Sequence, residues 1–94
     1  MADGVAVRVP VPAAVDRMRG LVDDVVLVDD DQIREALRAV RDTVGLILEP
    51  AAALGVAAAL HHRFGPGTLA TIVTGSNFSP GLLAELAELP VQTD

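Results

Sequence analysis

The sequence predicts an α/β fold in which short apolar strands alternate with helices and pair at least partly in parallel. Residues 5–9 alternate between valine and other side chains, which is the period-two pattern of a half-buried strand. Residues 25–28 are a compact run of valine and leucine, and residues 69–74 are apolar nearly throughout, as in a buried parallel strand. Because helical patterns separate these three segments, we expect part of a three-layer sheet covered by helices.

The clearest helix is expected between residues 29 and 44. Asp29 and Gln32 have the spacing of a capping box, and the acids that follow Asp29 suit the positive end of a helix dipole. An apolar stripe continues at helical spacing through Ile33, Leu37, Val40 and Val44.

Prolines mark the start of the other expected helices. Pro12 begins a helix that weakens at Gly20, and Pro50 begins an alanine-rich helix that runs to about His62. Ser79 and Pro80 form an N-cap and first-turn pair for a last helix, and residues 90–94 are expected to be a frayed tail.

The composition limits both the size and the core of the protein. With 94 residues the chain is expected to form one piece, residues 1–94, with a large surface for its volume. Hydrophobic residues make up 51%, yet there are two phenylalanines and no tryptophan or tyrosine. The expected core of alanine, valine and leucine is therefore thin.

Charge and hydropathy exclude several classes of partner. The net charge of −6 repels nucleic-acid phosphates and anionic lipid surfaces, so we expect no nucleic acid and no membrane partner. The longest apolar run, residues 51–60, is too short to span a bilayer, and no signal segment precedes it. There is no cysteine, which fits a reducing compartment, and a cytoplasmic location is expected.

No metal site is expected. His61 and His62 are adjacent, so on a helix they point in different directions, and no further histidine or acid completes a ligand set at helical spacing. The acids at residues 29–31 are better explained as a solvated helix cap than as a cation site.

Four short motifs occur in an order and spacing that resemble a known enzyme group. They are Ala2-Asp3-Gly4, the "LVDDVVLV" run of residues 21–28, Leu48-Glu49-Pro50-Ala51, and Thr74-Gly75-Ser76-Asn77. Together they resemble fold-type II pyridoxal-phosphate enzymes of the threonine/serine dehydratase and serine racemase group. The resemblance implies the C-terminal part of the large cofactor-binding domain in the tryptophan synthase β-like fold.

The resemblance also implies a set of cofactor-binding residues. It assigns to Thr74 a hydrogen bond with the pyridine nitrogen, to Gly75 a close backbone approach to the ring, and to Glu49 and Gly4 positions beside the cofactor. Structural roles for two of these residues stay open. Thr74 is also explained as the end of a strand before a turn, and Glu49 as an acid favoured at a helix start.

The chain contains no lysine, and this absence limits what it does alone. Enzymes of this group hold pyridoxal phosphate as a Schiff base on a lysine amine, and the glycine-rich phosphate loop of the group is absent too. We therefore expect a C-terminal fragment or subunit with no catalytic residue of its own. Its expected partner is the N-terminal portion of the enzyme or a second copy, and its complete form would remove water and ammonia from a hydroxy-amino acid.

A different class of function remains open from the sequence. The chain is also explained as an autonomous small α/β binding or oligomerisation module that keeps an inherited fold without its chemistry. DNA upstream of Met1 discriminates the two hypotheses, because a lysine motif and a glycine-rich loop encoded there favour the fragment.

Overall fold

The computed structural model describes residues 1–75 and 80–88, and the regular elements in that part of the chain are helices. Two 3₁₀ turns are η1 (Asp3–Val5) and η2 (Pro50–Ala53). The α-helices are α1 (Pro12–Met18), α2 (Asp30–Val44), α3 (Leu54–His61) and α4 (Pro80–Glu88). No strand occurs among these described residues, so the predicted α/β class is wrong.

The three segments predicted as strands are irregular chain for a physical reason. Side-chain alternation indicates which faces of a segment are apolar, whereas a strand also needs a neighbour that pairs with its backbone N–H and C=O groups. Within the described residues, no backbone hydrogen bonds join residues 5–9, 25–28 and 69–74 to one another. Most of their apolar side chains instead face solvent, with Leu27 and Ile72 each 83% exposed, whereas Val26 and Val28 are half-buried.

Helix α2 forms as the sequence predicts. The Asp29 carboxylate accepts a hydrogen bond from the Gln32 backbone N–H at 2.8 Å, and the Gln32 side chain accepts one from the Asp29 N–H at 2.9 Å. At the other end, Gly45 has φ of 77° and donates its N–H to the carbonyls of Val40 and Arg41. Both ends of α2 are therefore satisfied locally, as expected for a stable helix boundary.

The core is small, as predicted, and is built largely from alanine; within the described residues its other buried side chains are leucine and isoleucine, and the predicted valines are only partly buried. One face of α2 packs on η2, α3 and Leu48, and Leu37 is the largest fully buried side chain. The buried cluster consists of Ile33, Ala36, Leu37, Leu48, Ala52, Ala53 and Ala57. Because each alanine removes little apolar area from water, this cluster contributes little stability per residue.

The proline-initiated helices are confirmed with shorter or altered bounds. Pro12 begins α1, which ends at Met18 and buries none of its residues. Pro50 begins a 3₁₀ turn before α3 continues to His61, and Pro80 begins α4. Ser79 and the predicted frayed tail, residues 90–94, lie outside the described residues.

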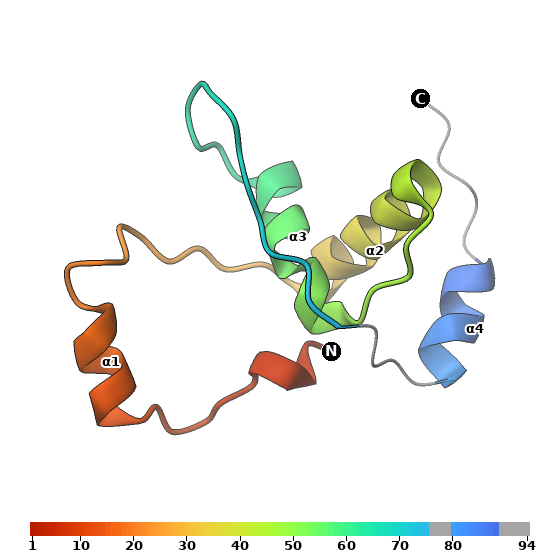
Figure 1. The fold of residues 1–94 in the computed structure, drawn as a ribbon. Coiled ribbons are helices and arrows are strands. Elements are labelled where there is room, and N and C mark those ends of the chain that lie inside the picture. The colour runs from red at the N-terminus through yellow and green to blue at the C-terminus, as the bar shows by residue number, and fades with distance from the viewer. Residues whose placement is uncertain (76–79, 89–94) are drawn as a thin grey trace.

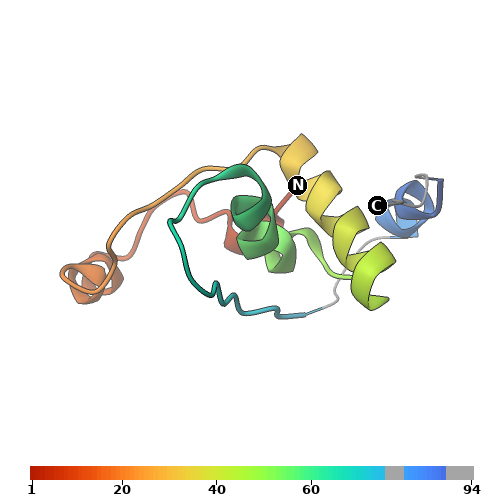
Figure 2. The same ribbon diagram turned by 90° about the horizontal axis from the view of Figure 1, so that it is seen from above.

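The helices are arranged around α2. In both views α2 lies between α3 and α4, while α1 stands apart on an arm (Figures 1 and 2). Arg34 of α2 donates from Nε to Glu85 of α4 at 2.7 Å, and this hydrogen bond raises the pKa of Arg34. The radius of gyration is 14.7 Å, larger than the roughly 12 Å of a compact domain of this length.

Replacing Asp29 tests whether the capping box stabilises the core helix. Asp29→Ala should lower the free energy of unfolding by about 1 kcal/mol, because the Gln32 N–H loses its acceptor. Urea unfolding followed by circular dichroism measures the change. Asp29→Asn is the matched control, since asparagine caps as well as aspartate; an equal loss in both variants would show that the cap is not the cause.

Candidate functional site

Glu49 lies at the junction between the core and η2. Its backbone is extended, with φ −70° and ψ 155°, and its carbonyl accepts a hydrogen bond from the Ala52 N–H at 3.0 Å. Its side chain makes no capping hydrogen bond to the turn that it precedes. The carboxylate therefore caps no backbone N–H of η2, and its place before the turn still suits the positive end of a helix dipole.

The Glu49 carboxylate packs directly against the backbone of Gly75. A Cβ placed on Gly75 would overlap Glu49 Oε1 and lie 3.0 Å from Glu49 Cδ. Gly75 also has φ of 70°, a conformation that L side chains rarely adopt. Glycine is thus required here both by the backbone conformation and by the neighbouring carboxylate.

Gly4 reaches the same place from the N-terminus. A Cβ on Gly4 would lie 3.2 Å from Ala51 Cβ and 3.9 Å from Glu49 Oε2, because η1 packs against η2. The N-terminal amine of Met1 lies 3.6 Å from Asp30 Oδ1, which holds this end beside α2. The structure therefore gathers Gly4, Glu49 and Gly75, which are far apart in the sequence.

Thr74 is placed beside this cluster by its covalent bond to Gly75. It is exposed, and within the described part of the chain its hydroxyl has no hydrogen-bond partner. An exposed hydroxyl donates or accepts a hydrogen bond to a neighbouring group. Ser76 and Asn77, the rest of the same motif, lie outside the described residues.

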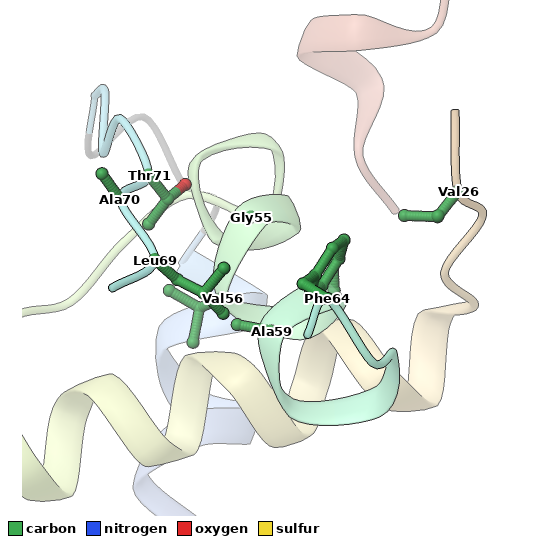
Figure 3. A pocket seen from close by; sticks show the side chains of 9 residues that line it. Val26, Gly55, Val56, Ala59, Phe64, Leu69, Ala70 and Thr71 are labelled. Atoms are coloured by element: carbon green, nitrogen blue, oxygen red, sulfur yellow. The ribbon is translucent and has the colours of Figure 1, made fainter. Parts of the chain in front are cut away.

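A close contact that the sequence analysis missed positions the segment carrying Thr74 and Gly75. Thr71 packs on Gly55 of α3, where an added Cβ would overlap the Thr71 hydroxyl and lie 2.8 Å from Thr71 Cβ (Figure 3). The available signal was one glycine inside an otherwise alanine-rich helix. Such a glycine indicates close approach by another segment.

The two histidines make separate contacts. His61 Nε2 lies 2.7 Å from Glu35 Oε2 on α2, whereas His62 Nε2 lies 2.8 Å from the carbonyl of Leu27. Among the described residues, no group of three histidine, cysteine or acidic side chains is arranged to hold a metal ion. The histidines instead link the end of α3 to α2 and to the segment around Leu27.

None of the helices in the described part of the chain is both long and apolar enough to cross a bilayer.

Comparison with known proteins defines the class to which this site belongs. Residues 1–75 match the family model of pyridoxal-phosphate dependent enzymes, and the chain belongs to this family. That match includes Gly4, Glu49, Thr74 and Gly75. The resemblance drawn from the four sequence motifs is therefore confirmed at the level of the family.

The curated relatives are longer than this chain. It is 35% identical over 75 residues to a serine racemase of Oryza sativa subsp. indica, an alignment that covers 72% of this chain and 22% of the racemase. It is 32% identical over 90 residues to an L-threonine ammonia-lyase of Geobacter sulfurreducens, covering 94% of this chain and 22% of the lyase. The chain thus spans about a fifth of the relatives that it matches, and no solved structure matches it.

Replacing Gly75 tests the contact with Glu49. Gly75→Ala and Gly65→Ala should each lose stability, because both glycines have positive φ, at 70° and 81°; this conformation costs a residue with a Cβ about 1–2 kcal/mol. Gly75→Ala should lose more stability than Gly65→Ala, because its added Cβ also overlaps Glu49, whereas nothing lies within 4 Å of a Cβ at Gly65. Thermal unfolding measures both.

A double variant isolates the carboxylate. Adding Glu49→Ala should recover the extra loss of Gly75→Ala and leave the loss of Gly65→Ala unchanged. If Glu49→Ala acts equally in both backgrounds, the carboxylate does not lie against Gly75 in solution.

Proposed function

We propose that this chain is one part of a pyridoxal-phosphate dependent enzyme that acts on a small hydroxy-amino acid. In this proposal the chain forms the side of the cofactor site that faces the pyridine nitrogen, and it is inactive without the rest of the enzyme. The family match and the two relatives, named for serine and threonine chemistry, support the reaction class. The convergence of Gly4, Glu49 and Gly75 beside an exposed Thr74 is the observation that carries the proposal.

The residues present fit one side of a cofactor site and not its covalent anchor. The exposed hydroxyl of Thr74 suits a hydrogen bond to a cofactor ring. Gly75 and Gly4 lack a Cβ and so let Glu49 and Ala51 pack close to the backbone beside it. The absence of lysine leaves no side-chain amine to which the cofactor could attach. The fit is therefore that of one side of a site whose remainder is built on another part of the enzyme. We call this side, formed by Gly4, Glu49, Thr74 and Gly75, the cofactor wall.

Each residue of the wall has a distinct task. When bound, pyridoxal phosphate supplies an electron sink that stabilises negative charge on the substrate's α-carbon. Thr74 would donate a hydrogen bond to the pyridine nitrogen without holding a proton there, so the site would support a moderate rather than a strong sink. Glu49, which packs on Gly75, keeps the Thr74–Gly75 backbone in place and presents a carboxylate as a hydrogen-bond acceptor.

The purified chain should form no side-chain adduct with pyridoxal phosphate. With no lysine, the terminal α-amino group is its sole primary amine, and that group has no phosphate cradle beside it in the sequence. Borohydride reduction followed by peptide mass mapping tests this. A stoichiometric adduct on any residue other than the N-terminus would overturn the prediction.

Thr74 is tested in a complete enzyme. A suitable chimera is the Geobacter sulfurreducens L-threonine ammonia-lyase in which this chain replaces the matched segment. Thr74→Ala should weaken pyridoxal-phosphate affinity about fivefold, the equivalent of one hydrogen bond. Thr74→Ser, which keeps the hydroxyl, should bind as the unsubstituted chimera does.

A charge at the same position should act differently. Thr74→Asp places a carboxylate that would hold a proton on the pyridine nitrogen, so it should change the ratio of elimination to side products as well as affinity. Absorbance spectra and product analysis, normalised to folded protein, measure both effects. Equal losses of thermal stability in the alanine and aspartate variants, with spectra and product ratios unchanged, would leave Thr74 a structural role alone.

A further inference from the structure

An apolar pocket opens beside the proposed cofactor wall. It has a volume of about 460 Å³ and lies between α3, the segment of residues 69–71, Phe64 and Val26 (Figure 3). This volume is within the range that accommodates large apolar groups. The pocket is open on one side, so it is a seat for another group rather than an enclosed void.

The chemistry of the lining selects an apolar occupant. The small residues Gly55, Ala58 and Ala59 of α3 leave room, and Val56, Phe64 and Leu69 supply aliphatic and aromatic surface. Among the described residues of the lining, Thr71 alone has a polar side chain, and its hydroxyl is turned against Gly55. A charged ligand would have no partner here, whereas leucine, isoleucine or phenylalanine side chains would lose their contact with water.

The area that the chain exposes indicates a large partner. Its accessible surface is 7153 Å², whereas a compact protein of 9.7 kDa exposes about 5,100 Å². The excess of about 2,000 Å² is more than twice the roughly 800 Å² per partner of a standard protein interface. Exposed apolar side chains such as Val25, Leu27 and Ile72 extend this surface beyond the pocket.

The pocket and the cofactor wall share one segment of the chain. Leu69, Ala70 and Thr71 line the pocket, and the same segment ends at Thr74 and Gly75 beside Glu49. A partner seated in the pocket would therefore lie next to the cofactor wall. In the relatives, the partner would be the rest of the same polypeptide, because the matched region is 22% of their length.

We propose that this pocket seats apolar side chains from the remaining part of the enzyme, and that this contact locks residues 69–75 in the position needed at the cofactor. The inference rests on the proposed function and adds the place of docking. Seating the partner at residues 69–71 removes the freedom of the segment that carries Thr74.

Filling the pocket tests the proposal. The full chain is co-expressed with a tagged Geobacter sulfurreducens L-threonine ammonia-lyase that lacks its matched segment. Ala59 is exposed and lines the pocket. Ala59→Trp should lower the amount of chain recovered with the lyase about tenfold, because overpacking excludes the partner's side chains. Ala14→Trp is the control, since Ala14 is an exposed alanine of α1, which stands apart from the pocket (Figure 1). It should be recovered within about twofold of the unsubstituted chain.

Two further measurements separate the possible failures. Circular dichroism of the purified chains should show equal folding for Ala59→Trp and the unsubstituted chain, since the pocket is open to solvent; unfolding by Ala59→Trp would overturn the proposal. Pyridoxal-phosphate absorbance of the recovered complex reports the proposed function independently. Association without cofactor binding would support the docking site and contradict the proposed function. Equal recovery of both tryptophan variants with cofactor bound would support the proposed function and contradict the docking site.

Other outcomes also decide the matter. If the shortened lyase is insoluble, the chimera is used, and Ala59→Trp should then lower its thermal stability relative to Ala14→Trp. Failure of the unsubstituted chain to join the enzyme in either format would overturn the proposal. A dimer of the purified chain that Ala59→Trp dissociates would assign the pocket to a second copy and overturn it as well.

Discussion

The close approach of residues 69–75 to α3 and to Glu49 is the contact on which the candidate site depends. Two glycines permit it: Gly55 leaves room for Thr71, and Gly75 leaves room for the Glu49 carboxylate. No strand pairing holds this segment within the described residues. Steric fit at two points therefore positions Thr74, and a single added methyl group at either glycine would displace the segment.

A small core coexists with a large apolar surface in this chain. Helix α2 closes over η2 and α3 and buries a cluster rich in alanine, while leucine, isoleucine and valine side chains of the irregular segments stay exposed. A self-sufficient domain of this size would bury its large aliphatic residues first, because they gain the most from leaving water. The distribution seen here differs from that pattern, and it is the reason for proposing a partner that covers the larger side chains.

In the proposed function, the chemistry is divided between this chain and another part of the enzyme. The proposal takes the covalent anchor from the other part, because this chain has no lysine, and assigns the side facing the pyridine nitrogen to Gly4, Glu49, Thr74 and Gly75. Such a division makes the affinity between the parts and the occupancy of the cofactor interdependent, since ligand binding to an assembled state stabilises it.

The sequence by itself determined the local features and the family. Asp29 and Gln32 predicted the cap of α2, Pro12, Pro50 and Pro80 predicted helix starts, and the four motifs identified the pyridoxal-phosphate enzymes, because each depends on neighbouring residues or on ordered short patterns. Only the tertiary structure decided that the apolar segments do not pair as strands, that Gly55 receives Thr71, and that Glu49 lies against Gly75. These are contacts between distant residues, and neither periodicity nor capping signals specify which segments meet.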